Sequence, residues 1–261
     1  MKIYVQSRGR GQDEDYCWLR VTSENSQDLE VPAAIAKVSH LIQSESPSLV
    51  LARYDRELLL LLTGMEAKER TDLRGRKIRN SVAWVVEDSE ENEQKLRAIA
   101  ANYLQELLSD NIDKAIQFGG EYGFEVCDRA ILEMETIEKA SNGDTKLECR
   151  LGKNSEDLRE LLAYELESRR LPEDNGPLVV VTGIKSESTL KEAGVWRGLS
   201  NLVKPDSVKA DRWKEPYKKS LESGEEEEKS AKTAAANPAI TLAGILIGGL
   251  GIFYLLLLLF Q

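Results

Sequence analysis

The chain has 261 residues, of which 41% are hydrophobic and 31% are charged, and its formal net charge is −10. The apolar content suffices for a folded core, and the acidic balance argues against a nucleic-acid duplex as a partner, because phosphate backbones require a basic protein face. His40 is the single histidine, which leaves little basis for a zinc site or for histidine-assisted catalysis. We therefore expect no metal, no cofactor and no identifiable catalytic residue. Whether the chain is an enzyme stays open, with a non-enzymatic role favoured.

The first 86 residues predict a sheet-dominated segment. Ile3 and Val5 alternate with polar residues, and the five leucines at 58–62 indicate a strand that is buried on both faces. Tyr54-Asp55-Arg56 separates two apolar segments, as in a hairpin, and Pro32 favours the first turn of a short helix. Strands are expected at 2–7, 17–21, 48–53, 57–63 and 81–86, and a helix at 32–42.

Helices dominate the rest of the predicted domain. Asp88 and Glu91 form a capping-box pattern, and apolar residues then recur at helical spacing as far as Leu108. Further helices are expected at 111–117, 128–139, 155–167 and 186–193, short strands at 146–150 and 177–182, and a turn at 119–123. The fold class is therefore α/β or α+β: one mixed domain over residues 1–203, sheet-rich in its N-terminal half and helix-rich in its C-terminal half.

The C-terminal segment predicts a membrane anchor. Residues 239–260 carry no charge, and as a helix they would span about 33 Å, enough for a hydrocarbon core of about 30 Å. We expect a flexible charged linker at 204–236 and a transmembrane helix at 237–261; the alternative is a buried core helix. Lysines before the anchor and the absence of an N-terminal signal peptide favour a single-pass, tail-anchored protein with its N-terminal domain in the cytoplasm.

The predicted anchor contains closely spaced glycines. Gly244, Gly248 and Gly251 lie in its first half, where small residues let two helices approach closely in lipid. This pattern favours a homo-oligomer formed through the membrane helix. The alternative is that these residues reflect only the general frequency of glycine in membrane helices.

A basic segment stands out in this acidic chain. Residues 68–79 (KERTDLRGRKIR) carry six positive and two negative charges, a net of +4. Arginines suit bidentate contacts to phosphate or carboxylate, and the loop after the first strand offers two more. The candidate anion-binding residues are Arg8, Arg10, Arg74, Arg76 and Arg79. The alternatives are ion pairs within the chain, a protein partner, or anionic lipid headgroups.

Two segments carry a family resemblance. Residues 1–19 (MKIYVQSRGRGQDEDYCWL) and 70–88 (RTDLRGRKIRNSVAWVVED) resemble uncharacterised bacterial, cyanobacterial-type membrane-anchored proteins associated with conflict and defence systems. The resemblance covers at most residues 1–125. It implies a regulatory or effector module that works beside other components, and it transfers no site residue to this chain.

Three functions are compatible with these features. The first is a tail-anchored module whose cytoplasmic domain recognises a protein partner or signal and whose membrane helix anchors or oligomerises, with membrane disruption as its output in a defence setting. The second is a membrane-tethered sensor or enzyme for a small phosphate-bearing ligand. The third is a passive membrane scaffold.

Overall fold

The computed structural model describes residues 1–21, 27–134, 137–205 and 212–219. These residues belong to one compact unit, Met1–Lys219. The predicted membrane anchor at 237–261, with Gly244, Gly248 and Gly251, lies outside the described residues. Among the helices of the described ranges, none is both long and apolar enough to cross a membrane.

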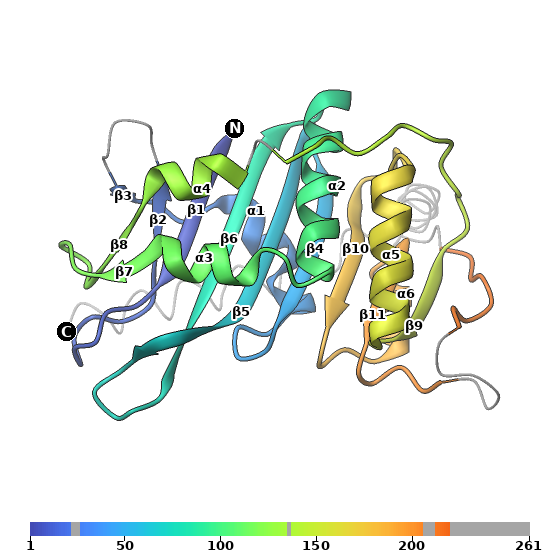
Figure 1. The fold of residues 1–261 in the computed structure, drawn as a ribbon. Coiled ribbons are helices and arrows are strands. Elements are labelled where there is room, and N and C mark those ends of the chain that lie inside the picture. The colour runs from blue at the N-terminus through green and yellow to red at the C-terminus, as the bar shows by residue number, and fades with distance from the viewer. Residues whose placement is uncertain (22–26, 135–136, 206–211, 220–261) are drawn as a thin grey trace, which may run out of the picture. The chain divides into compact units, whose positions relative to one another are not determined.

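A mixed sheet forms the centre of the unit (Figure 1). Within the described residues it has nine strands, and every neighbouring pair is antiparallel except β10–β11 and β11–β9, which are parallel. In order across the sheet the strands are β3 (Gln27–Leu29), β2 (Cys17–Val21), β1 (Lys2–Ser7), β6 (Lys77–Glu87), β5 (Glu57–Thr71), β4 (Ser48–Tyr54), β10 (Gly176–Thr182), β11 (Arg197–Ser200) and β9 (Arg150–Lys153).

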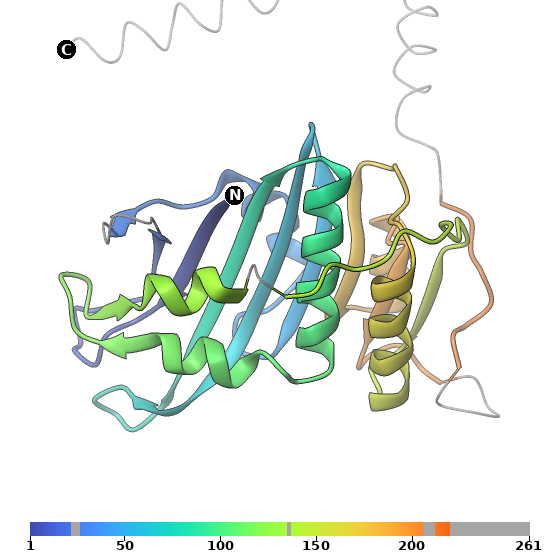
Figure 2. The same cartoon turned by 45° about the horizontal axis from the view of Figure 1, so that its top comes forward.

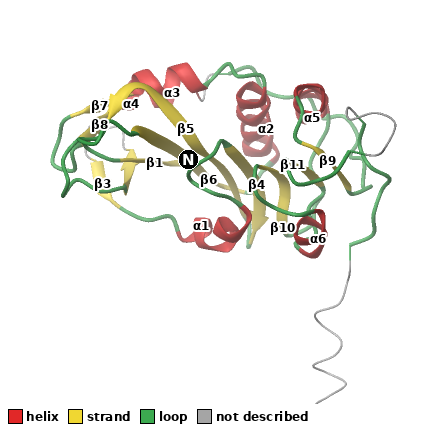
Figure 3. Cartoon of the chain, turned by 90° about the horizontal axis from the view of Figure 1, so that it is seen from below, coloured by secondary structure: helices red, strands yellow, loops and turns green. Residues whose placement is uncertain are grey.

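Helices cover both faces of this sheet, so the unit has three layers (Figure 3). One face carries α2 (Glu90–Leu104), α3 (Ser109–Ala115), α4 (Asp128–Glu133) and α5 (Glu156–Ser168), with the small hairpin β7 (Ile116–Phe118) and β8 (Phe124–Val126). Figure 2 shows α2 and α5 lying across this face. The opposite face carries α1 (Ala33–Val38), the 3-10 helix η1 (Ser39–Leu41) and α6 (Glu187–Glu192).

The two faces bury separate cores because strand side chains alternate. Leu58, Leu60 and Leu62 point toward the α2 side, whereas Leu59 and Leu61 point toward the α1 side. The run of five leucines is therefore buried on both faces, as the sequence predicts. The expected mixed architecture of strands and helices is confirmed, and the structure adds that the strands of both halves join one large sheet.

Several boundaries differ from the sequence-based expectation. β5 and β6 run far beyond 57–63 and 81–86, because their polar outer halves pair with each other beyond the core. The side chain that caps α2 belongs to Ser89 and not to Asp88: it accepts a hydrogen bond from the Asn92 amide at 3.3 Å. α4 ends at Glu133, well before 139.

The C-terminal half contributes more sheet than expected. β11 was not predicted, because its four residues include Arg197 and Gly198 and give no apolar alternation. β9 begins at Arg150, where the predicted strand ended. Both strands are held by parallel pairing to a neighbour from elsewhere in the chain, which local sequence does not reveal.

Residues 212–219 lie against the edge strand β9. The Lys214 amide donates to the Leu151 carbonyl at 2.9 Å, and the Tyr217 amide donates to the Cys149 carbonyl at 3.0 Å. The Tyr217 hydroxyl also donates to the Val195 carbonyl. The domain boundary expected at 203 therefore falls inside the compact unit, which extends to Lys219.

Candidate functional site

Four of the five candidate arginines meet at one end of the sheet. The loop that follows β1 lies against the turn of the β5–β6 hairpin, and the Leu73 amide donates to the Arg10 carbonyl at 3.2 Å. A cleft of about 210 Å³ opens between the two loops. We call it the arginine cleft, and it is lined by Arg8, Arg10, Gly11, Gln12, Asp15, Asp72, Leu73, Arg74 and Arg76.

Asp72 organises the hairpin side of the arginine cleft. Its carboxylate accepts hydrogen bonds from the Arg74 amide at 2.9 Å and from the Arg76 amide at 3.0 Å, and it forms an ion pair with the Arg76 guanidinium at 2.6 Å. The Arg76 side-chain hydrogen bond, together with these amide donors, lowers the pKa of Asp72 from 3.8 to about 2. The Arg76 side chain therefore stabilises the hairpin turn that also carries Leu73 and Arg74.

Arg8 forms the floor of the arginine cleft on the other side. Its side chain is only 12% exposed, one Nη donates to the Gly11 carbonyl at 3.1 Å, and the other lies 3.9 Å from the Asp72 carboxylate. The Nε atom is buried and has no hydrogen-bond partner among the described residues. The Tyr16 ring lies 5.6 Å from the guanidinium carbon, in cation–π range. The Arg8 charge is thus only partly compensated by protein groups.

Arg10 and Arg74 lie at the rim of the arginine cleft. Both side chains are exposed, and neither forms a hydrogen bond or ion pair with the residues that the structure describes. They project from two loops more than 60 positions apart in the sequence, which the contact between Leu73 and Arg10 holds together. These two guanidinium groups are free to bind an anion from solvent.

The structure separates Arg79 from the other four arginines. Its guanidinium lies 2.9 Å from the Glu66 carboxylate across the β5–β6 ladder and donates to the Gly64 carbonyl at 3.4 Å. Arg79 does not line the arginine cleft. Because Arg79 faces an acid directly opposite it on the neighbouring strand, its charge stabilises the hairpin.

A buried polar cluster around Arg70 joins the strands that lead into the two loops of the arginine cleft. Arg70 donates to the Asn80 side chain at 2.6 Å and to the Ser7 hydroxyl at 3.1 Å, and its guanidinium lies 3.9 Å from Asp113. Burial lowers the pKa of Arg70, and the Asp113 carboxylate opposes that shift. The cluster joins the end of β1 to β5 and β6, so it sets the distance between the two loops. Nothing in the local sequence marks Arg70 as buried.

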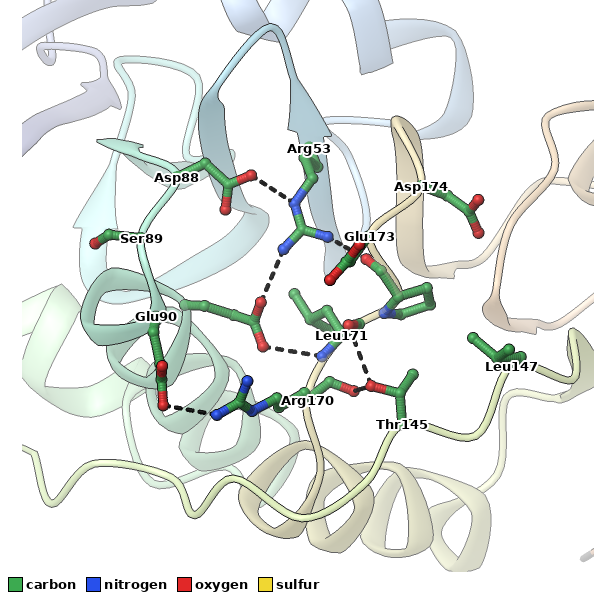
Figure 4. A pocket seen from close by; sticks show the side chains of 12 residues that line it. Arg53, Asp88, Ser89, Glu90, Thr145, Leu147, Arg170, Leu171, Glu173 and Asp174 are labelled. Atoms are coloured by element: carbon green, nitrogen blue, oxygen red, sulfur yellow. Dashed lines mark hydrogen bonds and ion pairs between the residues drawn. The ribbon is translucent and has the colours of Figure 1, made fainter.

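A cavity of about 710 Å³, larger than the arginine cleft, lies beside the first turn of α2 (Figure 4). Arg53 crosses its floor, with ion pairs of 2.8 Å to Asp88 and 2.8 Å to Glu93, and it donates to the Pro172 carbonyl. Arg170 pairs with Glu90 at 2.8 Å. Both arginines of this wall are thus neutralised by protein carboxylates, which identifies a structural network that ties α2 to the segment before β10.

Across the ranges that the structure describes, no group of three or more His, Cys, Asp or Glu side chains is arranged to hold a metal ion.

No protein-family model, curated protein or solved structure matches the chain.

Proposed function

We propose that the compact unit binds a small phosphate- or carboxylate-bearing ligand in the arginine cleft, and that residues 237–261 anchor this unit to a membrane. The observation that carries the proposal is the convergence of Arg8, Arg10, Arg74 and Arg76 from two loops that are distant in the sequence. This arrangement favours the ligand-sensing hypothesis over a passive scaffold.

Charge supports an anionic ligand. The arginine cleft has four arginines against Asp15 and Asp72, a local balance of +2 in a chain whose net charge is −10. Asp72 is already occupied by Arg76 and by two backbone amides, so it competes weakly for Arg10 and Arg74. The Arg10 and Arg74 guanidinium groups, which have no partner within the described ranges, offer planar, bidentate donors that match phosphate oxygens.

The volume of the arginine cleft indicates which part of the ligand it can hold. The 210 Å³ of the arginine cleft falls below the range of about 300–1,000 Å³ that is usual for whole drug-sized ligands. We infer that the anionic end of the ligand is held between the loops while the remainder stays at the protein surface. Candidate ligands are therefore phosphorylated metabolites, nucleotides and cyclic oligonucleotides, bound through their phosphates.

The membrane part of the proposal rests on the sequence. The uncharged residues 239–260 have the length of a bilayer-spanning helix, and Gly244, Gly248 and Gly251 favour self-association. Ligand binding to the compact unit would then change the clustering of the anchors. The resemblance to bacterial defence proteins supports such a regulatory or effector role without enzymatic chemistry.

A protein partner is the second candidate ligand class. Leu161 and Tyr164 lie one turn apart on α5 and are 49% and 68% exposed. An apolar helix stripe of this kind favours contact with another protein. Replacing both residues with lysine should abolish co-purification of such a partner and leave anion binding unchanged.

The test of ligand binding uses the full chain in detergent. Thermal unfolding is followed with pyrophosphate, nucleoside triphosphates and cyclic dinucleotides, for the natural sequence and for the double variant Arg10→Gln/Arg74→Gln. A ligand present at 100 times its dissociation constant should stabilise the fold by about 2.7 kcal/mol. Without ligand, the double variant should unfold at the same temperature as the natural chain, because neither side chain has a partner among the described residues. With ligand, it should lose the shift.

The matched control is Arg129→Gln/Arg150→Gln. These arginines are also surface residues, with side chains 88% and 32% exposed, and each forms an ion pair with a nearby glutamate. The control should retain the ligand-induced shift. A flat response of the natural chain to the whole panel, or a shift that both double variants lose equally, would contradict a specific site in the arginine cleft.

The anchor is tested separately by flotation of the full chain with lipid vesicles. Deletion of 237–261 should move the protein from the floating to the soluble fraction. Exchange for an unrelated apolar helix should restore flotation but not oligomerisation if the glycines mediate it. Flotation that survives the deletion would contradict the proposed anchor.

A further inference from the structure

A second cavity lies at the carboxyl ends of the three parallel strands. It measures about 460 Å³, and we call it the carboxyl-edge crevice. The lining includes the residues just after β9 and β10, the residue just after β11, the end of α2 and the first turn of α5. Its principal polar groups are Ser46, Asn154, Arg159 and Asn201, and its apolar wall is formed by Tyr103, Leu104 and Val181.

The connections that follow the parallel strands explain why a crevice forms at their carboxyl ends. The chain leaves β9 into α5 on one face and leaves β10 into α6 on the other, as Figure 3 shows. Leu158 of α5 and Leu190 of α6 belong to the two separate cores. When consecutive connections diverge to opposite faces, a crevice forms outside the carboxyl ends of the strands, and in open α/β sheets ligands bind in that crevice.

Two hydrogen-bonding side chains meet above Gly183, the first residue after β10. A Cβ atom placed on Gly183 would lie 3.3 Å from the Ser46 hydroxyl oxygen and 3.5 Å from the Asn201 amide nitrogen. The Ser46 hydroxyl is buried and has no hydrogen-bond partner within the described residues. A buried hydroxyl without a partner is costly, so the Ser46 hydroxyl is placed to form a hydrogen bond with a bound molecule, and the Asn201 amide lies beside it.

Arg159 provides the positive charge of the carboxyl-edge crevice. One Nη donates to the Asn154 side chain at 3.3 Å, and the other lies 3.9 Å from the carboxylate of Glu106. The Glu106 side chain is 82% exposed, so it compensates the arginine weakly. The other acid in the lining, Asp110, is paired with Lys68 at 2.6 Å. The guanidinium is therefore available to a ligand anion.

We infer that the carboxyl-edge crevice binds a ligand of nucleoside monophosphate chemistry. Arg159 contacts its single phosphate, Ser46, Asn154 and Asn201 bind its hydroxyl or amide groups, and the planar ring packs against Tyr103 and Leu104. The volume lies within the usual range of about 300–1,000 Å³ for a complete small ligand. This site is independent of the arginine cleft, with which it shares no lining residue.

The experiment measures binding of adenosine, guanosine, cytidine and uridine 5′-monophosphates to the full chain in detergent, by calorimetry and by thermal shift. At least one monophosphate should bind, and its nucleoside without phosphate should bind at least about tenfold more weakly, because a charged hydrogen bond is lost. Arg159→Met should reduce binding to the level of the nucleoside. Gly183→Val, which fills the space between Ser46 and Asn201, should abolish it.

Two controls separate this site from folding defects and from the arginine cleft. Ser46→Ala removes a hydroxyl that has no hydrogen-bond partner in the part of the chain that the structure describes, so the melting temperature should not fall although binding weakens about fivefold. Arg10→Gln/Arg74→Gln should leave monophosphate binding unchanged. The inference is overturned if none of the four monophosphates binds, or if the bound one keeps its affinity in both Arg159→Met and Gly183→Val.

Discussion

The Arg53 guanidinium lies 2.8 Å from the Glu93 carboxylate, an ion pair that joins the end of β4 to the first turn of α2. Glu93 also lies 3.2 Å from the Arg97 guanidinium and accepts a hydrogen bond from the Leu171 amide at 2.9 Å. One buried carboxylate thus compensates two buried arginines and fixes the segment that leads into β10. The position of β10 in turn sets the carboxyl-edge crevice at its other end.

Glu93→Leu should be strongly destabilising. The substitution removes the carboxylate that pairs with both Arg53 and Arg97, which are only 7% and 0% exposed. Breaking a buried pair in this way costs about 3–5 kcal/mol, measurable as a lower midpoint in urea unfolding. Arg129→Ala, which breaks an ion pair between side chains that are 88% and 61% exposed, should change the stability by less than about 1 kcal/mol. Equal effects of the two substitutions would contradict the structural role of Glu93.

Gly64→Ala and Gly75→Ala should reduce the folding stability by different amounts, and the difference separates the effect of steric contact from that of backbone strain. Both glycines have left-handed backbones, with φ of 75° and 74°. A Cβ on Gly64 would lie 2.1 Å from the Ser46 carbonyl oxygen, whereas nothing lies within 4 Å of a Cβ on Gly75. We expect losses of about 2–5 kcal/mol for Gly64→Ala and about 1 kcal/mol for Gly75→Ala in thermal unfolding. The β5–β6 register shifts between Leu62 and Met65, next to Gly64, and similar losses would show that the backbone there moves to make room for the Cβ atom.

The stabilisation due to Asp72 should depend on pH. Its pKa falls from 3.8 to about 2 on folding, so the charged form stabilises the native state above the ordinary value. That contribution is lost as the pH falls through about 2. The melting temperatures of the natural chain and of Asp72→Asn should therefore differ by a constant amount at neutral pH and converge on acidification. A difference that persists unchanged below the folded pKa would contradict the charge-based explanation.

Glu106→Gly should stabilise the protein. Glu106 follows the C-cap of α2 with φ of 63°, a left-handed position that glycine adopts without steric cost. The expected gain is up to about 1 kcal/mol in chemical unfolding. The neighbouring Gln105→Gly is the control, because its φ of −85° suits any residue, and it should destabilise or have no effect. A loss of stability in Glu106→Gly would mean that the weak contact with Arg159 outweighs the backbone strain.

Local patterns predicted most of the elements and part of the site. The alternation of Ile3 and Val5 and the leucine run located β1 and the core of β5, and the stripe that ends near Leu108 located α2. The same patterns missed β11 and the outer halves of β5 and β6, because pairing with another strand holds polar residues in place there. Of the five arginines predicted to bind an anion together, four line one cleft, whereas Arg79 lies outside it and forms an ion pair with Glu66.

The sequence by itself determined most of the strands and helices, the excess of arginine in 68–79 and the uncharged segment at 239–260, because these properties depend on residues a few positions apart. Tertiary structure alone decided which loops meet. Arg10 reaches Leu73 because β1 pairs with β6, and Ser46 reaches Gly183 because β4 pairs with β10. Long-range strand pairing has no local signal, since its free energy comes from burying two distant segments against a common core.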